Sequence, residues 1–183
     1  MKKAILILGT LVVLGVIITA YVIGSDLLEY AETKDKDVSG NIEDVRTDTG
    51  GSVTEEEMAN FKSKGLNPFG QAKSMEELTD RDYREYIHGM SHQKVKAEEK
   101  WGFYEINDER IEWLLDGLAL EESQAELTDL NVYQDILERW KEADFSRVDE
   151  DHNTIWRLQG GTIGKATGIL SLEEEQLYID SQR

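Results

Sequence analysis

The segment from Ala4 to Ile23 contains no charged residue and directly follows Lys2 and Lys3. Its twenty residues, at a helical rise of about 1.5 Å each, match the roughly 30 Å hydrocarbon core of a bilayer. The sequence therefore predicts a transmembrane helix. Because positively charged flanks stay in the cytoplasm, the two lysines predict a cytoplasmic N-terminus and an extracytoplasmic position for the rest of the chain.

A cleavable signal peptide is the alternative interpretation of this segment. The apolar region of a signal peptide usually has about 7–15 residues and is shorter than this one. Val22-Ile23-Gly24 resembles a weak cleavage site, and no cysteine follows that could carry a lipid anchor. We therefore expect residues 1–24 to hold the lysine pair and an uncleaved signal anchor, which places the protein in the cell membrane as a single-pass protein.

Residues 25–66 are expected to form an acidic, flexible stalk, because they offer few large apolar side chains to offset the entropy of ordering. Thr54 and Glu57 have the spacing of a capping box, which predicts a short helix near the end of the stalk. The whole chain has 38 acidic and 20 basic residues and a formal net charge of −18. This charge excludes nucleic acid as a partner, since nucleic-acid binding depends on clustered Lys and Arg.

Residues 67–183 have the composition of a folded domain. Gly65, Pro68 and Gly70 interrupt the chain at its entrance, and apolar residues then recur at helical spacing. The sequence predicts an all-α fold, a small domain of four to six helices behind the N-terminal transmembrane helix. Tryptophans normally lie in a core. At least three of the four are expected in one buried cluster: Trp101, Trp113, Trp140 and Trp156.

Capping residues and glycines predict where the helices begin and end. One helix is expected to begin at Thr79 or Asp80 and to continue through Trp101 to Gly102. The next is expected to begin after Asn107. The later helices are expected from Asp129 to Ala143, from Ser146 to Gly160 and Gly161, and after the capping box of Ser171 and Glu174.

The motif "HGMSH" is the first candidate site. His88 and His92 are four residues apart, so both can project from one face of a helix, as zinc ligands do. Gly89 stands where the HExxH motif has glutamate, so that motif is not met. A third ligand would have to come from His152, Asp149 or Asp151. The alternative is that the histidines are surface residues or hydrogen-bonded core residues, with His152 bonded to a backbone carbonyl.

The glycine-rich segment from Gly160 to Gly168 is the second candidate, as an anion-binding loop formed by Gly160, Gly161, Gly164 and Lys165. Ala166 follows Lys165, where a phosphate-binding loop has Ser or Thr, and the preceding segment is helical rather than a strand. The sequence therefore predicts no nucleotide or other cofactor. We expect an ordered connection with Ile163, Ile169 and Leu170 turned inward and Lys165 turned outward.

Three segments carry a resemblance to a known family: "NPFG", "HGMSHQKVKAEEKWGFYEI" and "DHNTIWRLQGGTIGKATGILS". Together they resemble a family of short, membrane-anchored proteins of Gram-positive bacteria, described as a domain of unknown function. The resemblance covers about Asn67 to Glu175. It implies one extracytoplasmic domain behind an N-terminal anchor, and it brings no catalytic residues to this chain.

Two functional hypotheses remain. The first is a membrane-anchored, non-enzymatic interaction module that binds a protein or peptide. The alternative is a metal-dependent or hydrolytic enzyme built on His88, His92 and His152. Convergence of the three imidazoles in a cleft would discriminate between these two hypotheses.

Overall fold

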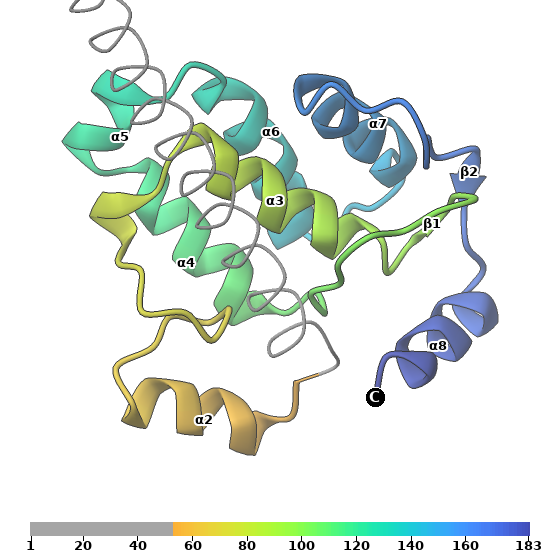
Figure 1. Ribbon diagram of the computed structural model, residues 1–183, viewed down its shortest axis with the longest axis horizontal. Coiled ribbons are helices and arrows are strands. Elements are labelled where there is room, and N and C mark those ends of the chain that lie inside the picture. Colours follow the sequence, from red (N-terminus) through yellow and green to blue (C-terminus); the bar gives the residue numbers. More distant parts are fainter. Residues whose placement is uncertain (1–52) are drawn as a thin grey trace, which may run out of the picture. The chain divides into compact units, whose positions relative to one another are not determined.

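The computed structural model describes residues 53–183, which all belong to one compact unit, Thr49–Arg183. The predicted anchor and most of the predicted stalk lie outside these residues. In chain order the elements are α2 (Glu55–Ser63), the 3₁₀ helix η1 (Met75–Glu77), α3 (Asp80–Ser91), β1 (Val95–Lys96), α4 (Asp108–Leu118), α5 (Glu121–Glu126), α6 (Leu130–Lys141), α7 (Val148–Leu158), β2 (Gly168–Ile169) and α8 (Leu172–Ser181) (Figure 1). Within residues 53–183, no helix combines the length and apolar character needed to cross a bilayer.

The prediction of a mostly helical domain is confirmed: residues 67–183 form six α-helices, α3 to α8, and α2 precedes them at the end of the predicted stalk. The six-residue α5 has no strong periodicity or side-chain cap, so local sequence signals did not indicate it. Other caps were predicted well. The capping boxes of Thr54 with Glu57 and of Ser171 with Glu174 begin α2 and α8, because each box satisfies backbone N–H groups at a helix start.

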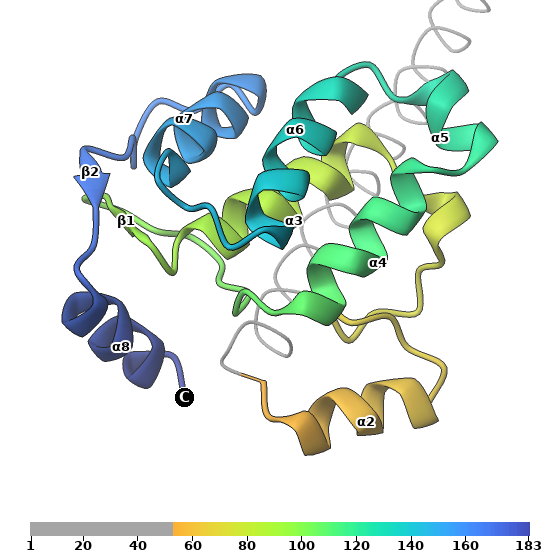
Figure 2. The same ribbon diagram turned by 180° about the vertical axis from the view of Figure 1, so that it is seen from behind.

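Helix α3 lies at the centre of the fold, with α6 and α7 packed against it, and α4 packs in turn on α6 (Figures 1 and 2). The core is rich in aromatic rings. Phe69 stacks on Tyr86 with ring centroids 3.8 Å apart, and Tyr83 stacks on Tyr133 at 5.3 Å. These contacts hold α3 in a fixed position, and α3 carries His88 and leads directly into His92.

The predicted length of the helix that begins at Thr79 was wrong. Helix α3 ends at Ser91, and the chain then forms β1, which pairs antiparallel with β2 (Val95 with Ile169). Just before this pairing, the backbone carbonyl of Lys94 accepts a hydrogen bond from Leu170 N–H at 2.7 Å. The Lys94 side chain forms an ion pair with Glu175 at 2.7 Å. Contacts with a distant part of the chain therefore override the local helical pattern.

The predicted cluster of three buried tryptophans was also wrong. Trp140 is buried, but Trp101 has 64% of its surface exposed. Trp113 and Trp156 are half-buried. Trp101 follows the helix that ended early, so it lies on an extended segment outside the core. The Trp156 indole N–H donates to the Ile163 carbonyl at 2.8 Å, so this ring supports a loop.

Candidate metal site

The structure brings the three histidines of the chain together. His88 lies on α3, His92 directly follows the last residue of α3, and His152 lies on α7, the helix packed against α3. Their ring centroids are 4.6 Å (His88–His92), 4.5 Å (His88–His152) and 5.4 Å (His92–His152) apart. One ring nitrogen from each lies within 4.8 Å of the others. The i,i+4 spacing of His88 and His92 thus brings their rings to one side, as expected, and His152 completes the cluster.

The cluster is largely removed from water. His92 and His152 are 1% and 0% exposed, and His88 is half-buried. Burial disfavours the charged imidazolium, so it lowers the pKa of His88 to about 2 and that of His92 to about 4, and it lowers the pKa of His152 as well. All three imidazoles are therefore neutral near pH 7, the form that binds metal ions.

The hydrogen bond of His92 determines which of its nitrogens carries the proton. Nδ1 of His92 lies 2.7 Å from the carbonyl oxygen of Gly102. A carbonyl oxygen only accepts, so Nδ1 carries the hydrogen and Nε2 keeps its lone pair. Gly102 has φ of +82°, a conformation that favours glycine, and this turn presents its carbonyl to the ring.

His152 is held in the same tautomer. Its Nδ1 lies 3.2 Å from Oδ1 of Asn153, an atom that only accepts hydrogen bonds. Nδ1 therefore carries the hydrogen, and Nε2 of His152 keeps its lone pair. Sequence reasoning expected a backbone carbonyl as the partner of His152; the backbone carbonyl partner belongs to His92 instead.

His88 is the only member of the cluster that can donate toward the others. Its Nε2 lies 3.0 Å from Nε2 of His152, so a proton on His88 Nε2 would satisfy His152. Among the described residues, Nε2 of His92 has no hydrogen-bond donor. Among the three Nε2 atoms, those of His92 and His152 carry lone pairs and only that of His88 can carry a proton, which is an electron-rich arrangement suited to a cation.

The nitrogen separations in the cluster can be compared with those of a tetrahedral metal site. Zn–N bonds of about 2.0–2.1 Å place two ligand nitrogens about 3.3–3.4 Å apart. The His88–His152 nitrogen pair is already at 3.0 Å. The widest separation, within 4.8 Å, would close by about 1.4 Å at most to reach the tetrahedral value.

The other proposed ligands do not join the cluster. Asp151 is buried and accepts hydrogen bonds from Arg139 at 2.7 and 3.0 Å and from the Trp140 indole at 3.0 Å. Asp149 is not among the residues whose ligand atoms converge, although its charge acts on His152. Ser91 donates to the His88 carbonyl at 2.6 Å, so it is not paired with its neighbour His92 as a nucleophile would be.

A basic group lies beside the cluster. Lys100 donates from Nζ to the His92 carbonyl at 2.9 Å, and Nζ lies 3.8 Å from the centre of the Tyr178 ring. Burial lowers the pKa of Lys100 to about 8. Its positive charge further disfavours protonation of His92 and His152. Lys100 therefore helps to keep the imidazoles neutral, and it also opposes the charge of a bound cation.

The glycine loop, Gly160 to Gly168, is ordered and packed against the domain, as expected. Gly160 has φ of +71° and ends α7, and Gly164 has φ of +84°. A side chain on Gly164 would lie 2.6 Å from the Glu99 carbonyl oxygen, so only glycine fits there. The orientation of Ile163 and Ile169 was predicted wrongly: they are 54% and 39% exposed, because backbone hydrogen bonds hold the loop instead of apolar side chains.

Lys165 is exposed, as predicted, and it borders a polar pocket of about 460 Å³ that is lined mainly by residues of α6 and α7. The pocket walls also carry Arg147 and Arg157, together with Asp135 and Glu150. Gly160, Gly161 and Gly164 do not line it. The structure therefore separates the glycines of the candidate anion loop from the pocket that Lys165 borders.

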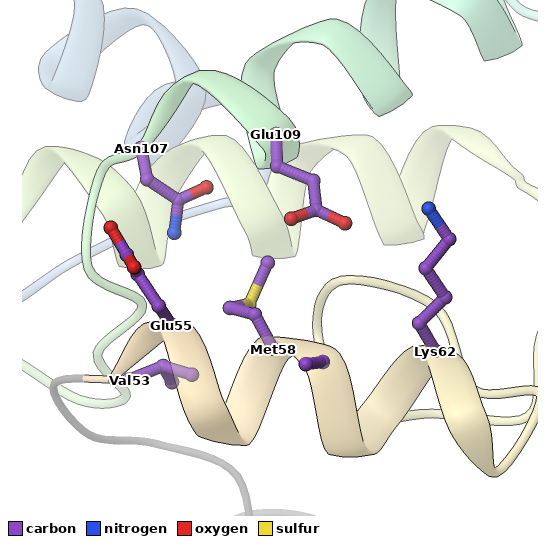
Figure 3. Close-up of a pocket in the computed structure, with 7 residues that line it drawn as sticks. Val53, Glu55, Met58, Lys62, Asn107 and Glu109 are labelled. Atoms are coloured by element: carbon purple, nitrogen blue, oxygen red, sulfur yellow. The ribbon is translucent and has the colours of Figure 1, made fainter.

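Sequence reasoning did not identify a second pocket, which lies between α2 and the start of α4 (Figure 3). Its volume is about 350 Å³, and Met58 of α2 projects into it toward Asn107, which precedes α4, and Glu109 of α4. None of the seven lining residues is a histidine. Such a pocket depends on how α2 packs beside the start of α4, and no local motif predicts that packing.

Comparison with known proteins agrees with the family resemblance in part. A family of unknown function (DUF6241) matches residues 87–180, which is half of the chain and includes all three histidines. No curated protein matches the chain, and no solved structure matches it either. Because the match covers half of its length, the chain belongs to this family of unknown function.

Proposed function

We propose that this domain binds a divalent transition-metal ion through His88, His92 and His152, with Zn²⁺ as the best-suited ion. The observation that carries the proposal is the pair of fixed tautomers. His92 and His152 both carry their proton on Nδ1, so both leave Nε2 for a metal within one buried cluster. Metal-binding histidines typically donate their other N–H to a carbonyl or carboxylate group in this way.

The ligand set favours zinc over the other common ions. Three neutral imidazoles suit Zn²⁺, whereas Ca²⁺ and Mg²⁺ require oxygen ligands. A site with three protein ligands leaves one tetrahedral position for water or another group. Cu²⁺ and Ni²⁺ also bind imidazole and compete at equal concentration, since intrinsic affinity follows the Irving–Williams order. The three histidines would bind the ion, and the ion would join α3 to α7.

A binding module is the better-supported role for such a site. His92 and His152 are almost fully buried, so a substrate would have little access to a metal between them. A bound ion would instead fix α3 and α7 as a rigid support for surface contacts with a protein or peptide. The enzyme alternative draws support from the vacant fourth position that three histidines leave, which is the arrangement of many catalytic zinc sites.

We further propose that the domain is held at the extracytoplasmic side of the cell membrane of a Gram-positive bacterium by residues 4–23. The support is the uncharged segment that follows Lys2 and Lys3. Replacing Val12 and Leu14 by arginine should release or misroute the protein, because each central charge costs about 2.5–3.5 kcal/mol on insertion scales. Unchanged membrane fractionation, or a mature N-terminus near Ser25, would contradict the anchor.

Metal binding is tested on the full-length protein, purified in detergent and stripped with a chelator. Titration with Zn²⁺ should show one site per chain, and Co²⁺ should give the visible absorption of a tetrahedral complex. His88→Gln should abolish both signals because it removes one of the three ligands. His88 is the half-buried member of the cluster, so this substitution should disturb the fold least. Lys165→Ala is the matched control and should bind as the unchanged protein does. Absence of stoichiometric binding by the unchanged protein would refute the proposal.

A further inference from the structure

We propose that Asn153 is the positioning residue of the metal site, and that the glycine loop exists in this form to hold Asn153 in place. The inference rests on the proposed metal binding, and it assigns a role to the loop that the ligands themselves do not explain. Asn153 would not contact the ion. It would act through His152, whose tautomer it sets.

The orientation of the Asn153 amide is determined by the backbone of Ala166. Oδ1 of Asn153 accepts from Ala166 N–H at 2.8 Å, and Nδ2 donates to the Ala166 carbonyl at 2.9 Å. A backbone N–H only donates and a carbonyl only accepts, so exchanging the amide oxygen and nitrogen would lose both bonds. The oxygen must therefore be the atom that faces Ala166 N–H.

The same oxygen faces the ring of His152. Oδ1 of Asn153 is 3.2 Å from Nδ1 of His152, and it can only accept there. The Ala166 backbone thus fixes the Asn153 amide so that its oxygen, an acceptor, faces Nδ1 of the imidazole. His152 is left with its proton on Nδ1 and its lone pair on Nε2, the nitrogen 3.0 Å from Nε2 of His88.

Contacts on both sides of Ala166 hold the loop against Asn153. Thr167 N–H donates to the Lys96 carbonyl at 2.7 Å, which joins the loop to β1. The Trp156 indole holds the Ile163 carbonyl at 2.8 Å, and Gly164 lies directly against the Glu99 backbone. Ala166 itself is only 5% exposed. These contacts account for an ordered, glycine-rich turn at this place.

Two substitutions separate positioning from simple stability. Asn153→Leu keeps the size of the side chain and removes both the acceptor for His152 and the donor to Ala166. Asn153→Asp keeps the acceptor for His152 and for Ala166 N–H, but it places a second oxygen against the Ala166 carbonyl. Both variants should lower the melting temperature of the metal-free protein. Asn131→Leu, at an exposed position on α6, is the matched control for the leucine substitution.

Metal affinity should not follow melting temperature. We expect Asn153→Leu to weaken Zn²⁺ and Co²⁺ binding by about 10–100-fold, the usual effect of losing an outer-shell partner. Asn153→Asp should bind at least as tightly as the unchanged protein, because a carboxylate partner makes the imidazole a stronger ligand. In the metal-free protein, ¹⁵N spectra should show the His152 proton on Nδ1 in the unchanged protein and in Asn153→Asp, but not in Asn153→Leu.

The results distinguish this inference from the proposed function. If the unchanged protein binds no metal, both fall. If it binds metal and Asn153→Leu binds equally well, the metal site stands and the positioning role of Asn153 is refuted. Equal losses of affinity in Asn153→Leu and Asn153→Asp would also refute it, because a purely structural residue would behave in that way.

Discussion

Gly89 lies so close to Tyr104 that a β-carbon on Gly89 would be 2.7 Å from Cδ2 of the tyrosine ring. The two residues are also joined through their backbones, since Tyr104 N–H donates to the Gly89 carbonyl at 3.3 Å. Gly89 stands between His88 and His92 on α3, so this close approach brings the segment after β1 against the histidine cluster. It explains a glycine in the last turn of α3, although glycine within a helix costs about 1 kcal/mol relative to alanine.

We expect Gly89→Ala to destabilise the domain despite its better helix propensity. Overpacking against a buried ring typically costs about 1–3 kcal/mol, which exceeds the roughly 1 kcal/mol gained in propensity. Chemical denaturation of the unchanged and substituted proteins measures the difference. An increase in the free energy of unfolding would show that Tyr104 moves aside without cost.

Gly89→Glu is the sharper form of the same test, because it completes the HExxH pattern of zinc proteases. We expect this variant to fold poorly and to gain no hydrolytic activity, since the space that glutamate needs is filled by Tyr104. Circular dichroism and a general peptidase assay, each with and without Zn²⁺, give the result. A folded, metal-dependent peptidase would support the enzyme alternative.

The histidine cluster shows how far sequence reasoning reaches. The i,i+4 spacing of His88 and His92 is a local property, and it correctly placed both on one side of α3. The arrival of His152 depends on the packing of α3 against α7, and the tautomers depend on Gly102 and Ala166. Tertiary contacts bring these residues to the histidines. From the sequence alone, convergence of the three histidines was therefore only one of several possible arrangements.

The same division applies to the fold. Capping residues such as Asn107 and Ser171 act on backbone groups within the next three residues, so the starts of α4 and α8 were predicted correctly. The end of α3 was not, because it depends on pairing between Val95 and Ile169. The prediction that at least three tryptophans are buried failed for a similar reason, since Trp101 is apolar but lies on a segment outside the core.

Trp140 and Trp101 should differ strongly in their contribution to stability. Trp140 is 2% exposed and its indole donates to Asp151, whereas Trp101 is 64% exposed. Trp140→Ala should cost about 3–5 kcal/mol, while Trp101→Ala should stay within about 0.5 kcal/mol of the unchanged protein. Urea denaturation followed by circular dichroism measures both. Similar losses in the two variants would mean that Trp101 is covered by a contact in solution.

Acid should destabilise the metal-free domain through its histidines. The pKa of His92 is about 4 in the folded protein because of burial, against about 6.5 when unfolded. Between these values the unfolded state binds more protons, so the free energy of unfolding falls as the pH is lowered. His92 alone should account for a loss of about 2 kcal/mol at pH 5.

This pH dependence is separated from that of the carboxylates by observing the imidazoles directly. NMR spectra of the metal-free protein should show no titration of His88 or His92 between pH 8 and pH 5, because the pKa of each lies below that range. Unfolding curves at the same pH values should show the stability falling meanwhile. An imidazole of the folded protein that titrates near pH 6.5 would contradict the buried, neutral cluster.

The glycine loop provides the last prediction, because Gly161 and Lys165 should respond in opposite ways to substitution. A β-carbon on Gly161 would lie 2.3 Å from Nε1 of Trp156, the atom that holds the Ile163 carbonyl. Gly161→Val should therefore displace the indole and destabilise the domain by about 1–3 kcal/mol. Lys165 is exposed and forms no ion pair with any described residue, so Lys165→Ala should change stability by less than about 0.5 kcal/mol. Thermal unfolding with ATP, GTP, phosphate and sulfate completes the test, and a rise in melting temperature that depends on Lys165 would show that the loop binds an anion.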